Sequence, residues 1–128
     1  MTMKKVQTNQ APEAIGPYSQ AIDTGDLVFV SGQIPLIPET MKLVDGDIKE
    51  QTLQVMNNLR AVLKEADLTF DDVIKFTIYL TDMNNFSILN ETYAEFLKEP
   101  YPARATVEVS QLPKGAEVEM DVIAKRSS

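Results

Sequence analysis

The fold of this chain is decided by the stretch Pro102-Ala103-Arg104-Ala105-Thr106-Val107-Glu108-Val109 and by the run Val118-Glu119-Met120-Asp121-Val122-Ile123-Ala124 that follows it. Both predict β-strands, because apolar and polar side chains alternate with a period of two. Arg104 falls on the polar side of the first run, and Glu119 on the polar side of the second. If the two strands pair, an arginine and a carboxylate share one face of a sheet. Alternation alone favours ordinary solvated charges there.

Composition indicates one ordinary globular domain over residues 1–128. Hydrophobic residues make up 44% of the chain and charged residues 24%, and the formal net charge is −7. A negative protein repels phosphate backbones, and the chain has no basic run, so nucleic-acid binding is disfavoured. No apolar run approaches the ~18 residues that a membrane span needs. We therefore expect no nucleic-acid partner, no membrane partner and a cytoplasmic location.

The residue types that are missing narrow the chemistry. The chain has no cysteine and no histidine. Disulfides, thiolate nucleophiles and imidazole bases are therefore excluded, and we expect neither a metal nor a cofactor. The five glycines are too scattered for a nucleotide-binding loop. Arginine, carboxylates, hydroxyl groups, amides and water remain for function.

Loops and strand ends of the N-terminal part carry several small or aromatic residues. After a short strand expected at residues 3–7, a loop with two prolines and a glycine ends at Tyr18. Tyr18 either caps the core with its ring or presents its hydroxyl to a ligand. Gly25-Asp26 joins two short strands as a hairpin. The second of these strands ends in Ser31-Gly32, small residues that allow a ligand to approach the backbone or simply terminate the strand.

Two helices and a long strand are predicted in the middle of the chain. Asp47, with Glu50 three residues later, is a good N-cap for a helix that ends near Asp67, and Met56 in its apolar stripe is expected to pack in the core. The strand at residues 73–81 is expected to have a core face and a mixed face that another subunit could cover. The core face comprises Ile74, Phe76, Ile78 and Leu80, and the mixed face comprises Val73, Lys75, Thr77, Tyr79 and Thr81.

Asn90 lies within the apolar stripe of the second helix, which Asp82 is expected to cap and which the prolines after Glu99 end. It is about 40° around the helix from Phe86. A buried amide that lacks partners costs about 1–3 kcal/mol. Its partner is therefore either a loop carbonyl, in a structural role, or a ligand in a polar pocket. The interleaved strands and helices predict a single α+β domain, with a mixed sheet and both helices on one face.

The sequence resembles the Rid family, the reactive intermediate or imine deaminases formerly called YjgF-type, over essentially its full length. Three segments carry the resemblance: Gly16-Pro17-Tyr18-Ser19-Gln20-Ala21, Val30-Ser31-Gly32-Gln33-Ile34-Pro35, and Pro102-Ala103-Arg104 followed by Leu112-Pro113-Lys114 and Val118-Glu119-Met120. The last of these matches the family signature in residue type and spacing, which is highly specific. The resemblance implies a chorismate-mutase-like fold and a homotrimer with a central β-barrel and sites in the clefts between subunits.

The resemblance also implies an activity. Rid proteins hydrolyse reactive 2-imino acids, formed from enamines that pyridoxal-phosphate-dependent serine and threonine dehydratases release, to 2-oxo acids and ammonia. Small 2-imino and 2-oxo acids, 2-iminobutanoate and 2-iminopropanoate among them, are then the expected ligands. Arg104 would clamp the substrate carboxylate, and Glu119 would orient and activate the attacking water. The implied substrate-binding residues are Tyr18, Ser31, Gly32, Asn90, Arg104 and Thr106, with Gly32 and Thr106 acting through backbone groups.

One position departs from the family pattern, because many relatives carry cysteine where this chain has Thr106. A backbone contact survives that change, whereas a side-chain contact would alter substrate range or rate. Three functions stay open. The first is the imine hydrolase, favoured because Arg104 and Glu119 are both present. The second is a non-catalytic sensor for small 2-oxo or amino acids, and the third is a chaperone-like or RNA-directed protein, the RNA role being disfavoured by the net charge.

Overall fold

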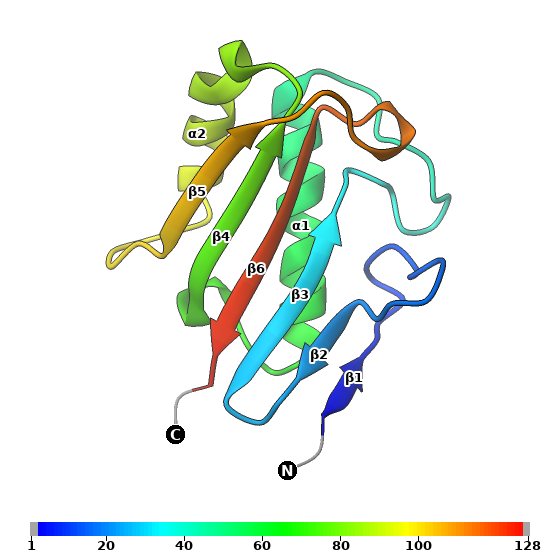
Figure 1. Cartoon of the computed structure of the whole chain (residues 1–128), viewed down its shortest axis with the longest axis vertical. Coiled ribbons are helices and arrows are strands. Elements are labelled where there is room, and N and C mark those ends of the chain that lie inside the picture. Colours follow the sequence, from blue (N-terminus) through cyan, green and yellow to red (C-terminus); the bar gives the residue numbers. More distant parts are fainter. Residues whose placement is uncertain (1–2, 127–128) are drawn as a thin grey trace.

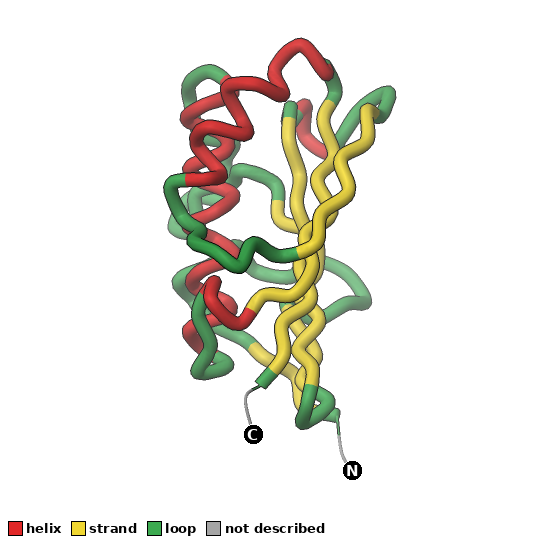
Figure 2. The backbone as a smooth tube through the Cα atoms, turned by 90° about the vertical axis from the view of Figure 1, so that its left-hand side faces the viewer, coloured by secondary structure: helices red, strands yellow, loops and turns green. Residues whose placement is uncertain are grey.

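One layer of the molecule is a six-stranded sheet, and the other consists of two helices. The computed structural model describes residues 3–126. Both helices cover the same face of the sheet, as predicted (Figures 1 and 2). The strands are β1 (Lys4–Val6), β2 (Ala21–Asp23), β3 (Leu27–Gln33), β4 (Val73–Leu80), β5 (Ala103–Glu108) and β6 (Val118–Lys125), and the helices are α1 (Ile48–Glu65) and α2 (Phe86–Ala94). Short 3-10 turns lie at Phe70–Asp72, Met83–Asn85 and Pro113–Gly115.

The order of the strands in the sheet separates β5 from β6, the two strands formed by the runs that open the sequence analysis. Along the sheet the order is β1-β2-β3-β6-β4-β5, and only β4 and β5 run parallel. A parallel pair needs a crossover connection, which α2 supplies between β4 and β5. β6 lies on the other side of β4, so β5 and β6 do not pair, and the pairing considered from the sequence is wrong.

The register of these strands puts Arg104 and Glu119 on opposite faces of the sheet. Residues paired across neighbouring strands point to the same side. Arg104 is paired with Phe76, which is buried beneath the helices, so Arg104 points to the helix side. Tyr79 on the other face of β4 is paired with Glu119. Within one chain the arginine and the carboxylate therefore do not share a face.

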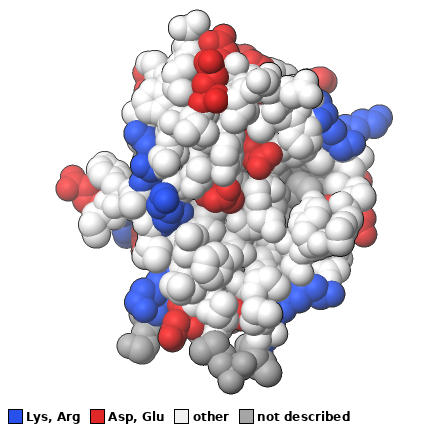
Figure 3. Space-filling model, in the orientation of Figure 1, with Lys and Arg blue, Asp and Glu red and all other residues white. Residues whose placement is uncertain are grey.

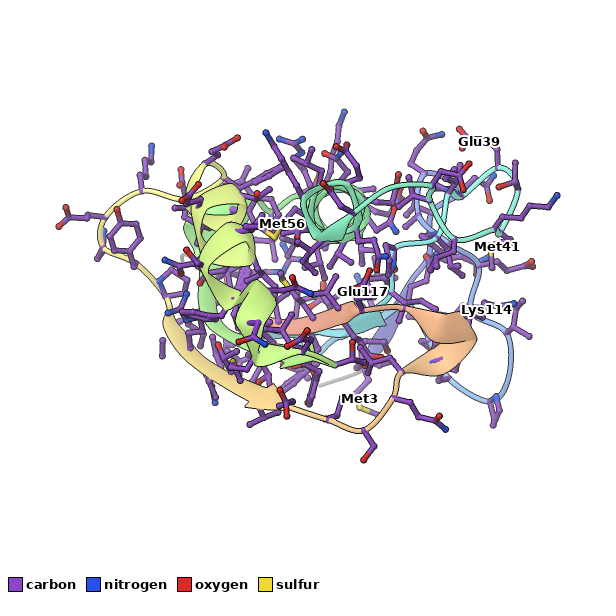
Figure 4. All side chains as sticks on the ribbon, turned by 90° about the horizontal axis from the view of Figure 1, so that it is seen from above. Met3, Glu39, Met41, Met56, Lys114 and Glu117 are labelled. Atoms are coloured by element: carbon purple, nitrogen blue, oxygen red, sulfur yellow. The ribbon has the colours of Figure 1, made fainter. Side chains whose placement is uncertain are left out.

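Helix α1 forms where its cap and its apolar stripe predict it. The Asp47 side chain accepts hydrogen bonds from the backbone N–H groups of Lys49 and Glu50, at 3.1 and 3.2 Å. Met56 is fully buried, which confirms its predicted core role (Figure 4). The core lies between this helix and the covered face of the sheet, and it includes Val28, Val55, Leu59, Phe76, Ile78, Leu80, Val118 and Met120.

Three local features differ from the prediction. A β-bulge between Val73 and Lys75 shifts the register with β6, so Val73 is buried and Ile74 is 45% exposed, the reverse of the expected faces. Asp82 caps a 3-10 turn, accepting from the N–H of Asn84 at 2.9 Å, and α2 begins only afterwards. The helix ends at Ala94, five residues before the Glu99 expected from the prolines.

No helix covers the other side of the sheet in the described part of the chain (Figure 2). This open face exposes apolar side chains, Phe29 at 44% and Val107 at 43%, while acidic side chains lie near its middle (Figure 3). Glu119 and Asp121 on β6 are among the residues that point to it. None of the described helices has the length and apolar character needed to cross a membrane.

Candidate functional site

Arg104 lies at the edge of the sheet against α2. Its Nη1 donates a hydrogen bond to Oδ1 of Asn90 at 2.6 Å, and its guanidinium carbon lies 5.2 Å from the ring centres of both Phe86 and Tyr93. Phe86 and Tyr93 are four residues before and three residues after Asn90, so all three lie on one side of the helix. Cation–π contacts and the amide therefore hold the guanidinium in a fixed place while the side chain stays exposed.

A pocket of about 450 Å³ opens beside this arginine. We call it the Arg104 pocket; its lining residues are Asn90, Tyr93, Ala94, Tyr101, Pro102 and Arg104. Asn90 thus bonds a charged side chain at a pocket, not a loop carbonyl. An arginine fork matches the geometry of a carboxylate, and four of its five N–H groups remain beyond the one given to Asn90. The Arg104 pocket can bind a small carboxylate.

Glu119 lies on the open face, in a second pocket of about 410 Å³. We call this the Glu119 pocket; Gly32, Tyr18 and Lys114 line it together with apolar side chains such as Ile34 and Met41. Figure 4 shows Lys114 and Met41 at the same end of the molecule. Burial, and secondarily the charge of Asp121, raises the pKa of Glu119 above the ordinary value for a glutamate. A carboxylate with a raised pKa is suited to exchange protons with water.

The side chain of Glu119 packs directly against the backbone of Gly32. An added Cβ at Gly32 would overlap Oε2 of Glu119 and would lie 3.0 Å from its Cδ. The sequence indicated a close approach to the backbone here, and the group that approaches is this side chain.

Ser31 on β3 is hydrogen-bonded to the end of the N-terminal loop, which carries Tyr18. The Ser31 hydroxyl donates to the backbone oxygen of Ser19 at 2.6 Å, and its N–H donates to the oxygen of Gln20 at 2.9 Å. Ser31 therefore fixes the loop that carries Tyr18. The Tyr18 side chain is exposed and lines the Glu119 pocket, so it does not cap the core with its ring.

Thr106 projects from the same face of β5 as Arg104, because it is paired with the buried Ile78. Its Oγ1 is buried and has no hydrogen-bond partner, the one such side-chain atom found within residues 3–126. The hydroxyl that replaces the common cysteine is therefore an unsatisfied polar group.

Sequence reasoning missed the roles of four residues at or beside the two pockets. Phe86 and Tyr93 were assigned to the helix stripe, although their spacing around Asn90 could have shown that they flank it. Lys114 has a left-handed backbone (φ 59°), and nothing in the local pattern predicts that it lines the Glu119 pocket. Asp121 lies on the polar side of its strand, where alternation alone favours ordinary solvated charges, but Tyr79 donates a hydrogen bond to it at 3.2 Å.

Comparison with known proteins identifies the family of this chain. Residues 8–126 match the family model described as "Endoribonuclease L-PSP". A crystal structure from Yersinia pestis, described as a protein of unknown function of the conserved Rid protein family, YyfA, is 50% identical and covers 98% of this chain and 100% of its own, with a TM-score of 0.95. The chain belongs to the Rid family.

Two further relatives illustrate the breadth of names within the Rid family. A "RutC family protein" of Pyrococcus abyssi is 52% identical over 97% of this chain and 98% of its own length. The Escherichia coli protein named "Putative reactive intermediate deaminase TdcF" is 42% identical over 98% of this chain and 100% of its own. A crystal structure of TdcF with bound serine has a TM-score of 0.92 and covers 97% of this chain and 99% of its own. The family resemblance of the sequence is confirmed, and the fold is that of YjgF-type Rid proteins.

Proposed function

We propose that this Rid-family chain hydrolyses 2-imino acids, 2-iminobutanoate and 2-iminopropanoate among them, to 2-oxo acids and ammonia. The observation that carries the proposal is the pair of pockets: one presents an anchored arginine fork, and the other presents a half-buried carboxylate of raised pKa. A 2-imino acid needs both, a clamp for its carboxylate and a group that handles water and protons. The relative named as a reactive intermediate deaminase supports this assignment.

The catalytic site is proposed to form between two copies of the chain. Arg104 and Glu119 leave opposite faces of one sheet, so one copy cannot bring both to one small molecule. The open face, with exposed Phe29 and Val107, is a surface that a second copy would bury. A homotrimer in which the Arg104 pocket of one copy meets the Glu119 pocket of the next would complete three sites.

In the proposed reaction Arg104 binds the substrate carboxylate and fixes the imine carbon near Glu119. Glu119 takes a proton from water as the water oxygen adds to the imine carbon, and it passes this proton to the nitrogen, which gives a carbinolamine. Glu119 then takes the proton of the carbinolamine hydroxyl and passes it to the same nitrogen as the C–N bond breaks, so ammonia leaves and the 2-oxo acid remains. Imines already hydrolyse in water, so orientation together with acid–base help is sufficient. Tyr18, Ser31, Gly32, Asn90 and Thr106 would shape or border the site.

A non-catalytic sensor of small amino or 2-oxo acids is the second candidate. It is favoured by the serine bound in the TdcF structure, since an anchored arginine can bind a carboxylate without turnover. The RNA cleavage named in the family model has less support here, because the net charge of −7 opposes contact with phosphates. We also keep the expectation that the chain needs no metal or cofactor.

The activity is tested by generating 2-iminobutanoate in situ and following the release of ammonia and 2-oxobutanoate. We expect the wild-type chain to exceed the uncatalysed rate, and both Arg104→Ala and Glu119→Ala to fall to it. A wild-type rate equal to the background, together with measurable binding of 2-oxobutanoate, would favour the sensor.

Complementation tests the site between copies. Arg104→Ala and Glu119→Ala chains are mixed, unfolded and refolded together, so that mixed assemblies form. Because each site needs an intact Arg104 from one copy and an intact Glu119 from the next, random mixing in equal amounts restores about one quarter of the wild-type sites in a ring. No recovery in assemblies shown to be mixed would place both residues in the same copy.

A further inference from the structure

Asp121 has no part in the reaction proposed above, although it lies beside Glu119 at the centre of the open face. Glu119 and Asp121 are two residues apart on β6, so their side chains leave the same face of the sheet at positions about 7 Å apart along the strand. Asp121 is half-buried, and its Oδ2 accepts a hydrogen bond from the Tyr79 hydroxyl at 3.2 Å. Tyr79 is also the residue directly opposite Glu119 on β4. One tyrosine thus borders both carboxylates and binds one of them.

Glu119 differs from Asp121 in what surrounds its carboxylate. Within the described residues no donor hydrogen-bonds to the carboxylate of Glu119, which lies against the Cα of Gly32. Without a donor to stabilise its charge, its protonation depends on burial and on neighbouring charges. The charged and titratable groups that face it are Asp121 on its own strand, Tyr79 and Lys75 on β4, and Glu13, Tyr18 and Lys114 around the pocket.

We propose that Asp121, oriented by Tyr79, is a positioning residue that acts through Glu119. Its fixed negative charge makes the proton on Glu119 harder to remove. Glu119 can then return to the substrate nitrogen the proton that it takes from water. This inference rests on the proposed function, because it gives a role in the reaction to residues outside the two pockets. The raised pKa of Glu119, to which the charge of Asp121 contributes, agrees with it.

The arrangement explains why the hydroxyl of Tyr79 matters. Its hydrogen bond opposes the rise that burial gives to the pKa of Asp121, and the nearby Lys75 acts in the same direction. Both favour the charged form of Asp121, which is the form that repels a charged Glu119. Asp121→Asn would keep the acceptor for Tyr79 and remove the charge. Tyr79→Phe would remove the hydroxyl and keep the ring.

The test is the pH dependence of kcat/KM for 2-iminobutanoate, corrected for the uncatalysed rate at each pH. In Asp121→Asn we expect the acid limb to move to lower pH by about one unit, as for a like charge at this distance in a partly solvated site. In Tyr79→Phe we expect a smaller shift in the same direction. Asp26→Asn removes one negative charge from the turn between β2 and β3, at the far end of the sheet, and should leave the limb in place.

An acid limb that stays in place in Asp121→Asn would overturn the proposal, and so would a loss of activity at every pH without a change in the shape of the profile. Titration of the Glu119 carboxyl by carbon NMR in the full-length chain gives a readout that needs no turnover. Its midpoint should fall in Asp121→Asn, and an unchanged midpoint would also overturn the proposal. A wild-type chain with no activity but with a shifted NMR midpoint would defeat the proposed function and leave the electrostatic coupling standing.

Discussion

Replacing Gly32 by alanine should lower activity strongly while the fold is kept. The added methyl would overlap Oε2 of Glu119 and would lie 3.0 Å from its Cδ and 3.4 Å from its Cγ. Carbon atoms in contact prefer about 3.5–4.0 Å, so the carboxyl group must move by about 1 Å. Gly32 does not have a positive φ. Alanine therefore fits its backbone, and it restricts the unfolded chain by about 0.4–1 kcal/mol.

The displacement sets the size of the expected effect. A shift of about 1 Å in a catalytic group can cost about 100-fold in rate, which corresponds to about 2.7 kcal/mol in the activation free energy. We expect kcat/KM for 2-iminobutanoate to fall by about that factor in Gly32→Ala, measured as release of 2-oxobutanoate. The midpoint of thermal unfolding should stay within a few degrees of the wild-type value, because only the end of a flexible side chain has to move.

A double-mutant cycle shows whether the loss passes through Glu119. In a Glu119→Gln background the same methyl displaces a group that no longer acts as a base. Gly32→Ala should then cost little further activity, so the two losses should not add. Full activity in the single variant would refute the reasoning, and so would two losses that add.

Three further outcomes follow from the same structure. Burial raises the folded-state pKa of both Glu119 and Asp121, so these carboxyls favour folding while protonated. The free energy of unfolding in urea should therefore fall as the pH rises through these pKa values, and it should fall less in Asp121→Asn. An equal pH dependence in that variant would contradict this. Asn90→Ala removes an anchor of Arg104 and should weaken 2-oxobutanoate binding about tenfold by calorimetry, whereas unchanged affinity would show that the aromatic rings suffice. Thr106→Val replaces an unpartnered hydroxyl and should raise the unfolding midpoint or leave it unchanged, and a lower midpoint would reveal a partner in solution.

Local pattern was enough to predict most elements of the fold. The cap at Asp47 and the apolar stripe predicted α1, period-two alternation predicted β5 and β6, and the Gly25-Asp26 turn predicted the hairpin of β2 and β3. Local pattern failed where the pairing of strands, and not the sequence of one strand, decides which face a side chain occupies. A single bulge at Ile74 exchanges the buried and exposed positions at the start of β4, and no residue type there predicts a bulge.

The candidate site was predictable as a set of residues but not as an arrangement. The family motif singled out Arg104 and Glu119, and each lies in a pocket. Their separation depends on β4 lying between β5 and β6, and the partner of a strand is set by the whole topology. β5 is an edge strand, and its polar face lies against α2 at the border of the helix layer. There Arg104 donates a hydrogen bond to Asn90 and packs on the ring of Phe86.

In the proposed ring, the sheet that separates the two pockets would give every copy a part in two sites. In a closed ring, one copy would lend its arginine to one neighbour and its glutamate to the other. A chain that lacks both side chains but still assembles would then silence two sites while occupying one position, so a ring of three with one such member would keep about one third of its turnover. When intact and doubly defective chains are expressed together, the fraction of activity lost should therefore exceed the fraction of chains that are defective.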